Sequence, residues 1–216
     1  MPCSRISSFI NLWVVAGINN DNLNQLLTMR IDSKLTDRQL KIIHAARNCM
    51  VRNGLVNTTV SDISEESKFA IGQIYRCFAR KEEIVREVLI TLYKRKLDKL
   101  LAMCNSFADI ARGLSDNCCP LENSERKLLL EFITESIHNT FFKETIYSIN
   151  MIYTKKLQKK LKVAMPFLTS AEITTIAEMI FIIYDGVIVR ENTDYKHGPY
   201  LESSYLKFFK VFDAKS

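Results

Sequence analysis

The chain has 216 residues, of which 47% are hydrophobic and 25% charged, an ordinary balance for a globular protein of one or two domains. Only six glycines and four prolines occur, which argues against a turn-rich β-sheet protein and favours long helices. The net charge of +6 comes from residues 29–100, which hold 15 Lys and Arg against 9 Asp and Glu. A local basic excess is expected of a domain that binds a polyanion, although a solvated basic surface would have the same composition.

The first 35 residues carry one short apolar run, over residues 9–18. The run is too short to span a membrane, and no small-residue cleavage site follows it, as one would in a signal peptide. Met29 stands just ahead of the first capped helix and could serve as an alternative start. We therefore expect residues 1–35 to lie outside the fold, as a disordered extension or a start-site artefact, and the protein to act in the cytoplasm.

The first predicted helix begins at Thr36, whose hydroxyl can form a capping box with Gln39 three residues later. Gly54 ends the helix, because glycine tolerates the positive φ that a helix end often requires. Between these limits, apolar residues recur at spacings of three and four, as on one buried face of a helix. They are Ile42, Ile43, Ala46, Cys49 and Met50.

Two short helices and then a long one are predicted next. Thr59 and Asp62 form a second capping pattern, and after a break near residues 67–70 a third helix is predicted over residues 71–77. A longer helix should run from Lys81 to about residue 104. Two short helices between longer ones form a helix-turn-helix, here over residues 59–78, whose second short helix enters the major groove of DNA.

The rest of the chain is also predicted to be helical. Residues 106–120 are less regular, and four further helices are expected over residues 124–139, 141–165, 170–192 and 200–212. We therefore predict an all-α protein. Residues 36–96 should form a three-helix helix-turn-helix DNA-binding domain, and residues 97–216 a helical effector-binding and dimerisation domain.

The sequence contains no recognisable pattern of catalytic, metal-binding or cofactor-binding residues. The six cysteines form no CxxC pair and have no histidine at zinc spacing, and no nucleotide-binding loop or nucleophile motif is found. Cys49 and Cys104 lie among apolar residues, which indicates reduced thiols in a core, whereas Cys118 and Cys119 leave a redox-sensing role open. We expect no enzymatic activity, no cofactor and no metal.

The region around the predicted helix-turn-helix carries a recognisable motif. Residues 58–63 read TTVSDI, and residues 72–85 read GQIYRCFARKEEIV. This segment resembles the tetracycline-repressor (TetR) family of bacterial transcription regulators, whose pattern is approximately TT-hydrophobe-x-D-I-A and then G-x-hydrophobe-Y-x-x-F-x-x-K-E-x-hydrophobe. The resemblance covers about 60 residues with the upstream helix. It implies a DNA-binding head followed by a variable ligand-binding domain whose last helices form a dimer.

The resemblance also implies which residues contact DNA. Thr59 caps the second helix, whose exposed N–H groups can receive a phosphate, and Gly72 lets the third helix approach DNA closely. Tyr75 and Lys81 match positions that contact phosphates, although Tyr75 could instead be a core aromatic residue. The positions that read bases are Ile71, Gln73 and Arg76, where Gln suits adenine and Arg suits guanine.

Four positions depart from the family pattern. Lys68 replaces the turn glycine, so we expect a non-glycine residue in the left-handed conformation at a cost of about 1 kcal/mol; its charge could add a phosphate contact. Ala70 cannot supply the usual Ser or Thr cap, a loss of about 1 kcal/mol. Arg80 stands in the cap position of the long helix, and Cys77 replaces the usual His or Tyr.

The C-terminal part offers candidates for a dimer contact and an effector pocket. The segment over residues 179–189 is apolar on nearly all sides, so it is expected to lie between its own core and a second subunit. We expect the change of Ile180 and Val187 together to Glu to give a monomer or an insoluble chain. The pocket candidates are mostly apolar, and each could instead be an ordinary core residue. They are Leu101, Phe107, Phe132, Ser136, Tyr147, Met151 and Tyr184.

These observations favour a sequence-specific DNA-binding transcriptional regulator that binds double-stranded operator DNA as a homodimer. The resemblance implies a repressor that an unknown hydrophobic small molecule, neutral or cationic, releases from DNA, and no membrane partner is expected. The alternative is a helical interaction protein that kept the fold but lost operator binding, which the departures at Lys68, Ala70 and Cys77 would explain.

Overall fold

The computed structural model describes residues 35–116, 119–193 and 198–212. Within these ranges there is no strand, so the fold is all-α, as predicted. No helix in the described ranges is long and apolar enough to cross a membrane. The extension expected over residues 1–35 lies outside the described residues except for Leu35. The elements are α3 Asp37–Asn53, α4 Val60–Ser67, α5 Ile71–Cys77, α6 Lys81–Met103, α7 Phe107–Ser115, α8 Asn123–Glu135, α9 Thr140–Ala164, α10 Ser170–Glu191, α11 Leu201–Phe209 and the 3-10 helix η2 Lys210–Phe212.

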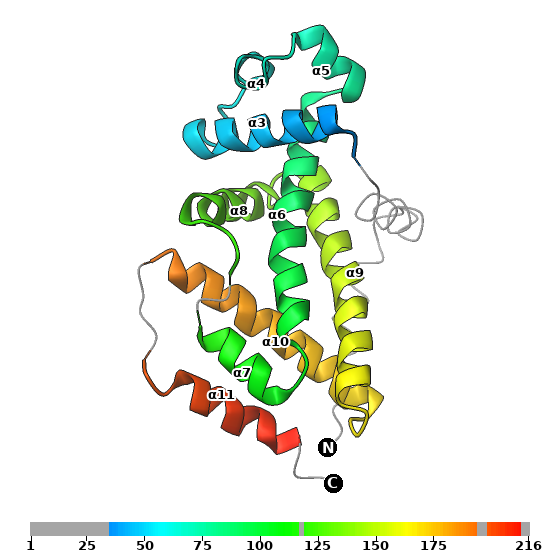
Figure 1. Cartoon of the computed structure of the whole chain (residues 1–216), viewed down its shortest axis with the longest axis vertical. Helices are drawn as coiled ribbons and strands as arrows, with labels where there is room; N and C mark the ends of the chain where they lie inside the picture. Colours follow the sequence, from blue (N-terminus) through cyan, green and yellow to red (C-terminus); the bar gives the residue numbers. More distant parts are fainter. Residues whose placement is uncertain (1–34, 117–118, 194–197, 213–216) are drawn as a thin grey trace.

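The molecule has a small head above a larger body (Figure 1). The head consists of α3, which lies across the top, and of α4 and α5 above it. The long helix α6 starts beside α3 and descends into the body, which comprises α7 to α11, with α9 alongside α6. α6 packs on α3 as well as on α7, α8 and α9, so head and body share it. The domain boundary expected near residue 96 falls within this helix.

The first two helices of the head begin where the capping patterns predict. Thr36 accepts the N–H of Gln39, whose side chain in turn accepts the backbone N–H of Thr36. Thr59 and Asp62 make the same pair of bonds, at 3.2 and 2.7 Å. Each pair satisfies N–H groups that a helix end leaves without a partner. The starts of α3 and α4 are therefore fixed by side chains within three residues.

A small apolar core holds the head together. Ile63 and Ile74 are fully buried, Phe78 is 1% exposed, and Val60 and Phe69 pack against the same cluster. Burying each large apolar side chain contributes about 1.5–3 kcal/mol. A helix as short as α5 would not persist alone in water, so this core both forms α5 and sets its angle to α4.

One helix of the body is missing from the sequence-based prediction. Residues 106–120 show little regularity, yet α7 occupies Phe107–Ser115. Ser106 caps it by accepting the N–H of Asp109 at 3.1 Å. The helix is too short for a strong periodic signal, and its formation depends on packing against α11, α6 and α10. Its buried residues are Phe107, Ile110, Ala111 and Leu114.

α10 carries apolar residues on both sides, but its outward side also carries the exposed Glu178 and Asp185. Ile180 and Val187 are 0% and 3% exposed within a single chain. Both side chains are therefore buried within their own subunit, so changing them to Glu would damage the fold of the subunit, which agrees with the insoluble-chain outcome and does not test the dimer contact by itself. The outward side carries Ile182 and Val189, which are 70% and 48% exposed. Phe208, near the end of α11, is also exposed.

Candidate DNA interface

The outward side of α5 gathers half of the residues predicted to contact DNA. Ile71, Gly72, Tyr75 and Arg76 occupy adjoining positions on one side of the helix, and all four are exposed. Tyr75 is 46% exposed, so it is a surface residue and not the core aromatic considered as the alternative. An apolar side chain, a phenol and a guanidinium thus project together, and such groups can contact base edges and phosphates.

Gly72 leaves the start of α5 unobstructed. A Cβ placed at this position would meet no atom within 4 Å, so packing within the head does not require glycine here. A side chain at this point would instead extend away from the protein. The absence of one keeps the backbone of α5 accessible to a partner that approaches closely.

Gln73 is placed differently from its exposed neighbours. It is half-buried, and its Oε1 accepts the backbone N–H of Ala70 at 3.1 Å. This bond supplies one half of the cap at a position where Ala70 has no capping side chain. A bidentate contact to adenine uses both the carbonyl and the NH2 of glutamine. The bond to Ala70 engages one of the two lone pairs of Oε1, so the second lone pair and the NH2 remain for such a contact.

The segments that flank α5 supply basic side chains. Lys68 lies in the turn before α5 with φ 61° and ψ 20°, so the replacement of glycine does place a non-glycine residue in the left-handed region, as expected. Its side chain is exposed, and Lys81 is half-buried at the start of α6. Thr59 is exposed at the start of α4, where its hydroxyl is engaged with Asp62.

Two further arginines, Arg38 and Arg80, lie over aromatic rings. The Arg38 guanidinium, on the first turn of α3, lies 5.7 Å from the centre of the Phe69 ring in the turn before α5. Sequence reasoning missed Arg38, because the contact joins residues that are distant in the chain. Arg80, in the cap position of α6, makes no capping bond; its guanidinium lies 5.4 Å from the centre of the Phe141 ring at the start of α9.

Two carboxylates of α4 are held in their ionised form. Hydrogen bonds from Thr59 lower the pKa of Asp62, and its charge at the start of α4 is favourable to the helix dipole. A hydrogen bond from Asn48, and then those from Arg52, lower the pKa of Glu66. Both carboxylates are therefore engaged in holding α4 to its cap and to α3.

Four of the seven candidate effector residues are half-buried or exposed. Tyr147 and Met151 are 44% and 36% exposed on α9, and Leu101 and Ser136 are half-buried. The Ser136 hydroxyl donates to the carbonyl of Ile133 at 2.6 Å. The other three candidates, Phe107, Phe132 and Tyr184, are buried.

The three buried candidates are engaged in packing. Phe107 stacks on Phe209, and Phe132 meets a neighbouring ring edge-on. The Tyr184 hydroxyl donates to the carbonyl of Lys96 at 3.1 Å. Three hollows of about 540, 500 and 440 Å³ lie along α3, α4 and α8. None of these hollows is lined by any of the seven candidates.

The cysteines of the described part of the chain carry free thiols. Cys49 and Cys104 are fully buried, as predicted. Burial raises the pKa of the thiols of Cys49 and Cys119, which reduces the thiolate fraction and hence reactivity. Cys118, the second member of the redox hypothesis, lies outside the described residues. Within those residues, no group of His, Cys, Asp and Glu is arranged to hold a metal ion.

This geometry defines a helix-turn-helix protein with an exposed second helix, and comparisons with known proteins place it more narrowly. Residues 42–88 match the family model described as bacterial regulatory proteins, tetR family. The uncharacterized HTH-type transcriptional regulator YfiR of Bacillus subtilis (strain 168) is 31% identical over 44% of this chain and 57% of its own length. The chain therefore matches a little over half of that relative.

Solved structures are similar over most of the chain. Salmonella enterica GusR is 17% identical with a TM-score of 0.64, covering 83% of this chain and 98% of its own. A TetR transcription regulator from Haloarcula marismortui ATCC 43049 is 14% identical with a TM-score of 0.59, covering 83% of this chain and 98% of its own. At such identities the likeness shows the fold. Residues 42–88 thus match the DNA-binding region of the tetR family, and the YfiR and Haloarcula marismortui relatives are described as transcription regulators.

Proposed function

We propose that this protein is a transcriptional regulator that binds double-stranded operator DNA through the outward side of α5. The observation that carries the proposal is the two-sided character of α5. Ile74 is fully buried on one side, while Ile71, Tyr75 and Arg76 are exposed together on the other. A helix that is anchored from behind and presents such groups outward can enter a major groove without losing its orientation.

The proposed contacts divide into two kinds. Lys68, Tyr75 and Lys81, with the N–H groups at Thr59, are assigned to phosphates, which position the protein without carrying sequence information. Ile71, Gln73 and Arg76 are assigned to base edges, and Gly72 to close approach of the backbone. The basic side chains before and after α5 contribute to the local excess of positive charge in residues 29–100.

We propose that the protein acts as a homodimer in the cytoplasm. Two heads are needed to contact successive major grooves of a symmetric operator. The proposed dimer contact is the outward side of α10, where Ile182 and Val189 are exposed; Phe208, which is exposed on α11, is a further apolar candidate. In this division the head up to residue 96 binds DNA, and the remainder pairs the subunits.

The regulatory proposal is a repressor that a hydrophobic small molecule releases from DNA. The support is the tetR-family match in the head, together with a body of six α-helices behind the head in the described residues, including α6. Such a ligand must bind better to the conformation that does not hold DNA, and DNA must then weaken ligand binding by the same factor. The seven candidate residues remain the proposed lining, in a conformation that brings Tyr147 and Met151 inward.

The test is equilibrium binding of the protein to labelled duplexes from the DNA that flanks its own gene. Arg76→Ala should weaken the best duplex by about 1–3 kcal/mol, which is about five- to 150-fold. Arg112→Ala is the matched control, since Arg112 is exposed on α7 in the body. A wild type that binds these duplexes no better than Arg76→Ala or an unrelated duplex would favour the interaction-protein alternative.

A further inference from the structure

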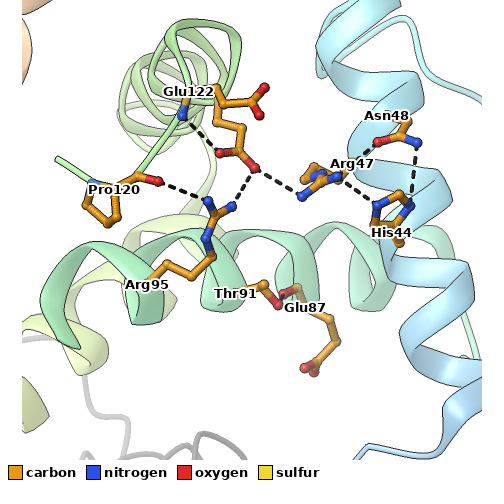
Figure 2. Close-up of polar contacts among 9 residues, drawn as sticks. His44, Arg47, Asn48, Glu87, Thr91, Arg95, Pro120 and Glu122 are labelled. Carbon is orange, nitrogen blue, oxygen red and sulfur yellow. Dashed lines mark hydrogen bonds and ion pairs between the residues drawn. The ribbon is translucent and has the colours of Figure 1, made fainter. Parts of the chain in front are cut away.

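The junction between head and body contains a buried carboxylate shared by two arginines. The Glu125 side chain, on α8, is 5% exposed, and its Oε1 accepts from Nη1 of Arg47 on α3 at 3.1 Å and from Nη1 of Arg95 on α6 at 2.6 Å. Its Oε2 accepts the backbone N–H of Glu122 at 3.1 Å. Figure 2 shows the two arginines reaching in from their separate helices, with Arg95 also donating to the carbonyl of Pro120 at 3.0 Å.

A second contact joins the same two parts six residues further along α8. Oε2 of Glu131 accepts the backbone N–H of Leu55, in the loop after α3, at 2.8 Å. The first contact holds α3 near its middle and the second holds the chain just beyond its end. Two separated contacts restrict rotation as well as separation, so α8 sets the direction in which α3 lies over the body.

The polar contacts continue from the junction into the helix-turn-helix. Arg47 donates to Oδ1 of Asn48 at 3.2 Å, and Asn48 donates to Oε1 of Glu66 on α4 at 3.1 Å. Oε2 of Glu66 also accepts hydrogen bonds from both Nη atoms of Arg52, each at 3.3 Å. The head therefore moves as one piece with α3, and the anchoring of α3 determines where α5 lies relative to the body.

We propose that Glu125 is a positioning residue for DNA binding: its carboxylate, held between Arg47 and Arg95, sets the orientation of the DNA-reading head on the body. Two guanidinium groups close to one oxygen are kept together by its negative charge. When that charge is removed, the two cations repel each other and α3 can move away from α6. No residue of α5 belongs to this contact, so each head should still recognise its half-site. The dimer should, however, accept a wider range of separations between the two half-sites.

This proposal rests on the dimeric DNA binding proposed above, and its test separates the two. The preferred half-site of the wild-type protein is first selected from random duplex DNA. Two copies are then placed at a series of separations that differ by one base pair, and the Kd is measured for each duplex and for a single half-site. The variants are Glu125→Gln, Arg47→Met and the double variant. Glu135→Gln is the matched control, because Glu135 is half-buried on the same helix and the described residues give its carboxylate no bond to α3 or α6.

We expect the wild type and Glu135→Gln to bind their best separation at least about tenfold more tightly than its neighbours, which is about 1.4 kcal/mol. Glu125→Gln and Arg47→Met should reduce that preference to about threefold or less and leave the single half-site Kd within about twofold. The double variant should match the single variants, since both break the same contact.

Two results would overturn the assignment: variants that keep the wild-type separation profile, or variants that lose the same affinity at every separation and on the single half-site. If Glu125→Gln does not fold by circular dichroism, Arg47→Met decides, because Arg47 is 27% exposed and Glu125 keeps Arg95. A wild type that selects no half-site would instead contradict the proposed function.

Discussion

Replacing Lys68 with glycine should make the protein more stable and, at the same time, a weaker DNA binder. Lys68 has φ 61°, and the left-handed region costs a non-glycine residue about 1–2 kcal/mol. Glycine removes that cost but increases the conformational entropy of the unfolded chain by about 0.4–1 kcal/mol. The difference lies between about 0 and 1.6 kcal/mol, with a middle value of about 0.8 kcal/mol that corresponds to a rise in Tm of about 2–3 °C for a chain of this length.

The same substitution removes an exposed ammonium group from the turn before α5. If Lys68 contacts a phosphate, its loss should weaken binding to all sequences about equally. It should also reduce the slope of log K against log salt concentration by about 0.9 for each subunit. Stability and affinity therefore change in opposite directions, which general damage to the fold would not produce.

Thermal melts and binding titrations over a range of salt concentrations measure the two effects. Lys68→Ala is the matched control, because it removes the charge but keeps the Cβ that makes the left-handed conformation costly. It should lose the same affinity as Lys68→Gly without the gain in Tm. A Lys68→Gly variant whose Tm falls would refute the strain reasoning, and an unchanged salt slope would refute the phosphate contact.

Four further outcomes are expected. Ile74→Ala truncates a fully buried side chain and should lower the free energy of unfolding by about 2–5 kcal/mol in a denaturant titration; a loss below about 0.5 kcal/mol would contradict its place in the head core. Asp62 has a lower pKa in the folded than in the unfolded chain. Its stabilising contribution is therefore present above the unfolded pKa of about 3.9 and is lost as the pH falls through the lowered value. Thermal melts in acid should show this loss of stability for the wild type and not for Asp62→Asn. Gln73→Ala should relax the preference at one base pair by about 1–3 kcal/mol, and competition assays with no altered position would exclude Gln73 as a reader. Ile182→Glu should yield monomers in sedimentation, whereas a wild type that is itself monomeric at micromolar concentration would remove the basis of the dimer.

Features of the head that depend on neighbours within a few residues could be predicted from the sequence. The capping boxes at Thr36 and Thr59 use side chains three residues away, so their residue types alone identify the helix starts. The left-handed conformation of Lys68 follows from the turn that the motif requires. Ala70 shows the limit of this reasoning, because the cap it lacks is supplied in part by the side chain of Gln73.

Features that depend on packing between distant segments could not be predicted. Glu125 lies 78 residues from Arg47 and 30 from Arg95, and nothing beside it in the sequence indicates either partner. Residues 179–184 and 187–189 of α10 are all apolar or aromatic, so the sequence does not tell which of them faces the core and which faces outward. Phe107 and Phe132 show the same ambiguity, since apolar residues at helical spacing are compatible with a pocket and with a filled core.

The most direct test of DNA reading by α5 is selection of binding sites from random duplex DNA. The wild type is compared with the triple variant Ile71→Ala, Tyr75→Ala, Arg76→Ala, whose changes lie only on exposed positions of α5. We expect the wild type to enrich an inverted repeat whose halves are about one helical turn, or a multiple of it, apart, and the triple variant to enrich no such site. Enrichment of the same repeat by both proteins, or of none by the wild type, would contradict the assignment of α5 as the DNA-reading helix.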